Sequence, residues 1–183
     1  VPADTEFVKR IKIQSALLTK FWGRPIYLGA TVLLPRDYAT STTKYPVLYR
    51  QGHFSLAPPI AFQEGSEFHQ AWMRDDFPRM LVVSLQHPAP YFDDSYGVNS
   101  VNVGPYGDAI MRELIPYLER KYRGIGQGYA RFTYGGSTGG WEALAMQVWY
   151  PAVFGGAWGW CPDPVDFRYH QIVNIYDDAN AYV

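Results

Sequence analysis

One short segment limits the possible folds of this chain most: Gly135-Gly136-Ser137-Thr138-Gly139 lies between a strand pattern and a helix pattern. The segment 130–134 before it is aromatic and β-branched, which is typical of a strand. The segment after it has apolar residues at the spacing of one helix face, namely Trp141, Leu144, Ala145 and Val148. So tight a strand-to-helix turn requires small residues two positions before and after its centre, and Gly135 and Gly139 meet that requirement.

The other elements alternate in the same way. Strands are predicted at 26–34, 46–49, 80–85 and 157–161, and a covering helix at 108–123. Asp108 is the expected N-cap of that helix, Gly124 lies just past its end, and Pro116 should bend it. Alternating strands and helices predict an α/β fold with a mostly parallel sheet flanked by helices.

Composition excludes several classes of protein. Of the 183 residues, 48% are hydrophobic and 18% are charged, which favours one globular domain over 1–183 rather than disorder. A net charge of −1 with no run of Lys or Arg predicts neither a nucleic-acid partner nor a membrane surface. Cys161 is the only cysteine, so an internal disulfide is excluded, and we expect it to be a small buried residue. No metal or cofactor is predicted.

Ser137 is the expected nucleophile, because a hydroxyl at such a turn projects clear of its own backbone. The alternative is a glycine-rich structural turn. Helix amides would stabilise an oxyanion beside Ser137, and the Thr138 N–H is the first expected donor. A second donor is expected from the loop after strand 46–49, where the His53 amide is preferred and Phe54 is the alternative, unless Gly52 only makes a turn.

Several motifs together resemble a known family. They are Lys44–Tyr49 leading to Gly52, Glu113–Leu118 and Gly135–Trp141. Over about residues 26–180 the chain resembles the esterase family of α/β-hydrolases that includes S-formylglutathione hydrolase, feruloyl esterases, enterochelin esterases and mycolyltransferases. Within it the chain is most similar to uncharacterised bacterial esterase-like proteins, which share the segments 94–96, 99–100, 104–108 and 161–167. It departs from the family at Gln51-Gly52, where His-Gly is common, and at Thr138, where many relatives have Met.

The resemblance implies a serine esterase that acts on a small-molecule carboxylic ester, aromatic or sugar-linked, through an acyl-enzyme at Ser137. It also implies no cofactor, and it favours a periplasmic or secreted location because some relatives are extracytoplasmic. Two alternatives remain open: an acyltransferase of the same family, and a non-catalytic binding module with the hydrolase fold.

The acid and base of a triad are harder to place. In α/β-hydrolases they follow the nucleophile in the order Asp or Glu, then His, and only 183 − 137 = 46 residues follow Ser137. Each further strand with its crossover needs about 30 residues. We therefore expect a fragment that ends after the strand following the nucleophile helix, an expectation that the start Val1-Pro2-Ala3 also favours. The alternative is that the acid and the base lie within this chain, in an arrangement formed by Asp163, Asp166 and His170.

Other polar and aromatic residues have simpler interpretations. His87 follows a predicted strand and is expected to line a pocket or form hydrogen bonds, and Asp93-Asp94 to cap a loop rather than bind a metal. Core packing is the expected role for most of five aromatic residues near the cleft, with stacking on a substrate as the alternative. These residues are Tyr91, Phe92, Trp141, Trp158 and Trp160.

Overall fold

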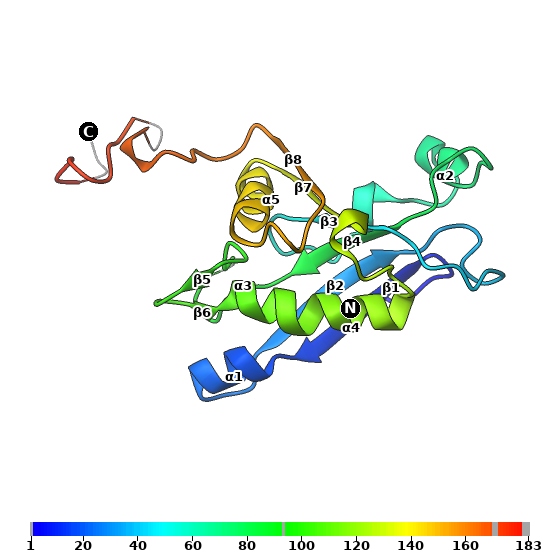
Figure 1. Cartoon of the computed structure of the whole chain (residues 1–183), viewed down its shortest axis with the longest axis horizontal. Coiled ribbons are helices and arrows are strands. Elements are labelled where there is room, and N and C mark those ends of the chain that lie inside the picture. The colour runs from blue at the N-terminus through cyan, green and yellow to red at the C-terminus, as the bar shows by residue number, and fades with distance from the viewer. Residues whose placement is uncertain (1, 93, 170–171, 181–183) are drawn as a thin grey trace.

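A six-stranded mixed sheet forms the centre of the protein (Figure 1). The computed structural model describes residues 2–92, 94–169 and 172–180. The strand order is β1-β2-β4-β3-β7-β8, in which β1 pairs antiparallel with β2 and β2 antiparallel with β4, while β4, β3, β7 and β8 run parallel. The bounds are β1 Val8–Gln14, β2 Tyr27–Leu33, β3 Val47–Arg50, β4 Leu81–Gln86, β7 Arg131–Gly136 and β8 Gly156–Trp160. The predicted strands and the mostly parallel sheet are confirmed.

Helices cover the two faces of the sheet unequally. Successive strand residues point to opposite faces, so Val83 packs in the large core while Val82 packs in a smaller one. The large core also contains side chains from helices α1, α4 and α5, whereas Trp72 of α2 lies in the smaller core. The helices are α1 Ala16–Trp22, α2 Glu67–Trp72, α3 Tyr106–Ala109, α4 Ile115–Tyr122 and α5 Thr138–Trp149, and the short strands β5 Asn99–Ser100 and β6 Gly104–Pro105 form a separate pair.

The helix predicted over 108–123 is present but differs in form. It begins with α3, passes through a π-helical turn at Ile110–Leu114 and continues as α4. Pro116 lacks a backbone N–H and lies at the start of α4, just after this π-helical turn. The wider turn accommodates the hydrogen bond that proline cannot donate. The expected N-cap was wrong, because Asp108 lies inside α3 and Pro105 occupies the cap position.

The face of the sheet over β3, β7 and β8 carries an apolar hollow, lined among others by Phe132, Tyr134, Trp158 and Trp160. Trp158 and Trp160 are 56% and 52% exposed, so the expected core packing was wrong for them, as it was for Tyr91 and Phe92. The expectation of a buried Cys161 was also wrong, because the strand ends before it and its thiol is exposed.

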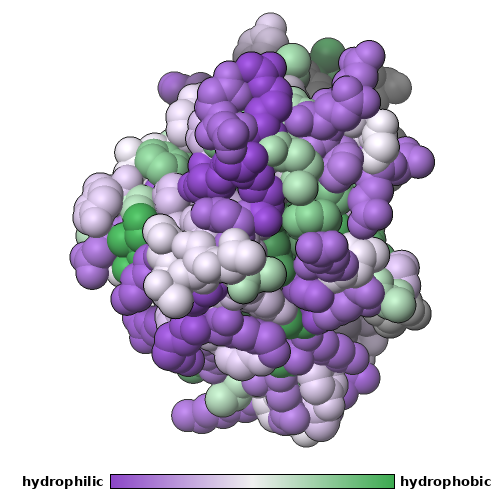
Figure 2. Space-filling model, turned by 90° about the vertical axis from the view of Figure 1, so that its right-hand side faces the viewer, coloured by the Kyte–Doolittle hydropathy of each residue, from purple (hydrophilic) through white to green (hydrophobic). Residues whose placement is uncertain are grey.

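The side of the molecule in Figure 2 is largely hydrophilic, and hydrophobic residues appear there mainly as a narrow strip between polar ones. Within residues 2–92, 94–169 and 172–180, no helix combines the length and apolar character needed to cross a membrane.

Candidate active site

Ser137 occupies the sharp turn between β7 and α5, as the sequence predicts. Its backbone has φ 55° and ψ −127°, a conformation that a residue with a side chain rarely adopts, and its side chain is exposed. A Cβ at Gly135 would lie 2.1 Å from the Gly139 carbonyl oxygen, and a Cβ at Gly139 would lie 2.4 Å from the Gln51 carbonyl oxygen. Both contacts are impossible for real side chains, so glycine is required at both positions.

The loop after β3 packs directly against this turn. Gln51 donates its backbone N–H to the Tyr134 carbonyl at 2.8 Å, which continues the pairing of β3 with β7. His53 lines the same cleft as Asp163, whereas Phe54 lines a different cleft. Of the two alternatives for the second oxyanion donor, only His53 therefore lines the cleft beside Ser137.

Asp163 is the acidic residue that the structure places against Ser137. Ser137 Oγ donates a hydrogen bond to Asp163 Oδ1 at 3.4 Å, and Thr138 Oγ1 donates to Asp163 Oδ2 at 2.8 Å. Asp166 instead pairs with Arg168 at 3.0 Å on the surface. His170 lies outside the described residues, so the internal arrangement of Asp163, Asp166 and His170 stays a prediction.

A cleft of about 560 Å³ opens beside Ser137 and Asp163. Tyr96 and Trp141 form one wall, with their ring centroids 5.5 Å apart in an edge-to-face arrangement. Burial, followed by the negative charge of Asp163, raises the pKa of Tyr96, so its hydroxyl remains a neutral hydrogen-bond donor at physiological pH. The cleft also contains Phe92, His53, Asp94, Val98, Val103 and Phe167. Its aromatic walls, together with the polar side chains of Ser100, Asn102 and Asp163, suit a small, partly apolar ligand.

A buried cluster of titratable groups, His87, Asp94 and Glu142, adjoins the cleft. His87 Nδ1 lies 3.3 Å from Asp94 Oδ1 and 3.0 Å from Ser95 Oγ, and His87 Nε2 lies 3.9 Å from Glu142 Oε2. Asp94 Oδ2 also lies 3.1 Å from His53 Nδ1 and Asp94 Oδ1 accepts the Tyr96 N–H, so Asp94 caps its loop as expected. The neighbouring Asp93 lies outside the described residues.

The pKa values in this cluster move in opposite directions. Burial raises the pKa of Glu142 to about 8, although the charge of His87 opposes the shift. Burial also disfavours the charged form of Asp94, but the hydrogen bond and charge of His87 outweigh it and lower its pKa to about 2. Burial opposes protonation of His87 too, yet Asp94 and Glu142 together raise its pKa.

Sequence reasoning missed Glu142 because it chose the wrong face of α5. Of the predicted face, Ala145 is buried and Trp141 and Leu144 are partly buried, but Val148 is 70% exposed, and the buried side extends instead to Glu142, Ala143 and Met146. The available signal was that Glu142 is the only charged residue in the segment Thr138–Trp149. The expected hydrogen-bonded role of His87 is confirmed.

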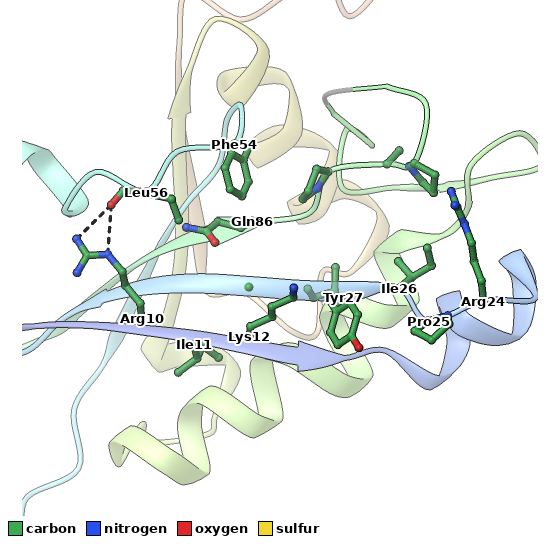
Figure 3. A pocket seen from close by; sticks show the side chains of 15 residues that line it. Arg10, Ile11, Lys12, Arg24, Pro25, Ile26, Tyr27, Phe54, Leu56 and Gln86 are labelled. Carbon is green, nitrogen blue, oxygen red and sulfur yellow. Dashed lines mark hydrogen bonds between the residues drawn. The ribbon is translucent and has the colours of Figure 1, made fainter. Parts of the chain in front are cut away.

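A second cleft, of about 590 Å³, lies over β1 and β2 (Figure 3). Arg10, Lys12 and Arg24 contribute to its lining, and Arg10 donates hydrogen bonds to the Leu56 carbonyl. Phe54 and Gln86 form the side nearest the loops that follow β3 and β4. Among the described residues that line this cleft there is no serine or acidic residue, whereas Asp163, the partner of Ser137, lines the other cleft, which is therefore the candidate active site.

A mixed sheet with parallel central strands, flanking helices and an exposed serine at a strained strand-to-helix turn defines the α/β-hydrolase fold. Solved structures agree. An S-formylglutathione hydrolase from Agrobacterium tumefaciens matches with a TM-score of 0.65 and 13% identity, over 94% of this chain and 67% of that one. A ferric enterobactin esterase from Salmonella typhimurium matches with a TM-score of 0.62 and 15% identity, over 94% of this chain and 40% of that one.

A ferulic acid esterase from the anaerobic fungus Anaeromyces mucronatus also matches, with a TM-score of 0.56 and 18% identity, over 87% of this chain and 61% of that one. The chain thus spans less than two thirds of the length of the enterobactin esterase and of the ferulic acid esterase. A search of curated proteins finds no match. The family model described as "Putative esterase" matches residues 27–162, and the chain belongs to this family.

Proposed function

We propose that this protein is a carboxylic ester hydrolase in which Ser137 forms an acyl-enzyme. The single observation that carries the proposal is the backbone of Ser137, which holds a strained conformation at an exposed turn between two glycines that admit no side chain. Such strain persists only where the surrounding structure enforces it, and it is concentrated at functional sites. Membership of an esterase family supports the same activity.

In the proposed reaction Ser137 Oγ attacks the ester carbonyl carbon while a general base takes the hydroxyl proton. The bond from that carbon to the alcohol oxygen then breaks, and the alcohol leaves with a proton. Water attacks the acyl-serine in the second half and releases the carboxylic acid. The N–H groups of Thr138 and His53 are the proposed donors to the oxyanion, since the first amides of α5 have no partner within the helix.

The proposed substrates are small esters with an aromatic acyl group. Trp141 and Tyr96 offer ring faces and edges in the cleft beside Ser137, and aromatic rings pack favourably in such arrangements. The structural relatives include a ferulic acid esterase with ferulic acid bound, which supports this choice of acyl group.

Labelling with a fluorophosphonate probe tests the nucleophile. The folded protein should be labelled on one serine, which peptide mass spectrometry should identify as Ser137, and Ser137→Ala should not be labelled. Thr133→Ser is the control, because it converts a buried secondary hydroxyl of β7 into the primary hydroxyl of a second serine and should not change labelling. Equal labelling of Ser137→Ala would show that the nucleophile lies elsewhere.

His53→Ala tests how His53 contributes. If only its backbone N–H matters, the variant should keep most of its labelling rate, because alanine supplies the same amide. A loss of about a hundredfold or more would assign the role to the imidazole, which already has Asp94 against Nδ1. Hydrolysis of aromatic and aliphatic nitrophenyl esters would then test the substrate class.

A further inference from the structure

The interior of the protein beside the cleft contains polar atoms without partners. Both carboxylate oxygens of Glu142 and Nε2 of His87 are buried without a hydrogen bond of normal geometry among the described residues, and Nε2 lies 3.9 Å from Glu142 Oε2. Glu142 is 0% exposed and His87 is 3% exposed. Buried polar atoms are almost always paired, because an unpaired one costs about 1–3 kcal/mol. The cluster therefore lacks a component that would satisfy these atoms.

The charge of the cluster indicates what that component is. In the protonation states that bind a metal, two carboxylates and a neutral imidazole carry a formal charge of −2. In the part of the chain that the structure describes, the basic side chains paired with Asp94 and Glu142 are His53 and His87, not Lys or Arg. A buried charge of this size is strongly unfavourable unless it is compensated. Without an ion, protons on Glu142 and His87, whose pKa values are raised, compensate this charge; a divalent cation that displaces them would neutralise it fully.

The ligand atoms are also close enough together. One nitrogen or oxygen of each of His87, Asp94 and Glu142 lies within 4.8 Å of the others. Metal–ligand bonds of about 2.0–2.2 Å require ligand atoms about 3–3.5 Å apart, so small side-chain rotations would complete the site. Ser95 Oγ, 3.0 Å from His87 Nδ1, would fix the imidazole from outside, as partners of metal-bound histidines do.

We propose that His87, Asp94 and Glu142 bind one divalent transition-metal ion. One imidazole with two carboxylates suits Zn²⁺ or Mn²⁺ better than Ca²⁺ or Mg²⁺, which prefer oxygen ligands only. The ion joins the end of β4, the loop that carries Asp94 and helix α5. Because Asp94 also contacts His53, the ion would stabilise the loop beside Ser137 without contacting the substrate. The sequence predicts no metal, and this proposal departs from that prediction.

The test uses the full chain and Zn²⁺, with Co²⁺ as a spectroscopic probe. After removal of metal with EDTA, isothermal titration calorimetry should show one Zn²⁺ per chain, and Co²⁺ should give visible absorption bands with a nitrogen ligand. Glu142→Gln and Asp94→Asn should weaken binding at least tenfold. Glu113→Gln is the control, since Glu113 is a partly buried glutamate that accepts the Leu17 N–H outside the cluster, and this variant should bind Zn²⁺ normally.

Failure of the wild-type chain to bind Zn²⁺, Mn²⁺ or Co²⁺ while its circular dichroism remains native would overturn the proposal, and this result does not depend on any variant folding. In that case a proton on Glu142, and not a metal ion, would compensate the negative charge of the cluster. Retained binding in folded Glu142→Gln and Asp94→Asn would overturn it as well. None of these measurements depends on hydrolysis, so the esterase proposal and the metal proposal succeed or fail separately.

Discussion

The ion pair between Arg131 and Glu119 holds the start of β7 against helix α4, and its removal should destabilise the protein strongly. Arg131 Nε and a terminal guanidinium nitrogen donate to the two oxygens of Glu119 at 2.6 and 2.7 Å, and Tyr49 donates to the same carboxylate at 3.2 Å. Burial and the charge of Glu119 raise the pKa of Tyr49, so the tyrosine stays neutral.

Arg131→Met should leave Glu119, which is 6% exposed, as a buried charge without its counter-ion. Breaking a buried pair in this way costs about 3–5 kcal/mol. For a chain of this size each kcal/mol lowers Tm by about 2–4 °C, so the expected loss is roughly 6–20 °C. Glu119→Gln combined with Arg131→Met should recover part of the loss, because the amide is neutral and still accepts from Tyr49.

Urea unfolding followed by circular dichroism measures these changes at equilibrium. Arg168→Met is the matched control, because it removes an arginine from a fully exposed pair with Asp166 and should leave the unfolding midpoint unchanged. A loss below about 1 kcal/mol for Arg131→Met, or a double variant less stable than Arg131→Met alone, would refute the reasoning.

Three further predictions concern the site and its surroundings. Gly139→Ala should destabilise the fold and abolish labelling of Ser137, because its Cβ would meet the Gln51 carbonyl at 2.4 Å, whereas Gly156→Ala, with nothing nearer than 3.5 Å, should do neither. In EDTA the protein should lose stability as the pH rises from about 4.5 through 8, because the raised pKa of Glu142 means that its carboxyl holds a proton more tightly in the folded state than in the unfolded state. Urea midpoints that do not change between about pH 5 and 9 would contradict this. Cys161 should react with a thiol reagent in the native state within minutes, and protection until unfolding would show that it is covered.

Local patterns predicted the strands and the turn at Ser137 because both depend on neighbouring residues. Short continuous runs of β-branched and apolar residues define β2, β3 and β4, and the two glycines around Ser137 define the turn. Family membership followed from the same short motifs.

Features that depend on distant contacts could not be predicted in this way. The burial of Glu142 depends on how α5 rotates against β7 and β8, which is set by glycine contacts and not by helical periodicity. The cluster also joins residues 87, 94 and 142, which no sequence spacing relates. Exposure of Trp158 and Trp160 likewise depends on what covers one face of the sheet.

The π-helical turn at Ile110–Leu114 has a consequence for comparing this chain with its relatives. A wide turn holds one residue more than a regular turn over nearly the same length of axis, and each residue advances an α-helix by about 100°. Relatives whose helix is regular here should align only with a one-residue gap inside this turn. Without the gap, the position aligned with Glu119 would be one that faces away from Arg131, and the counterpart of the ion pair would be overlooked.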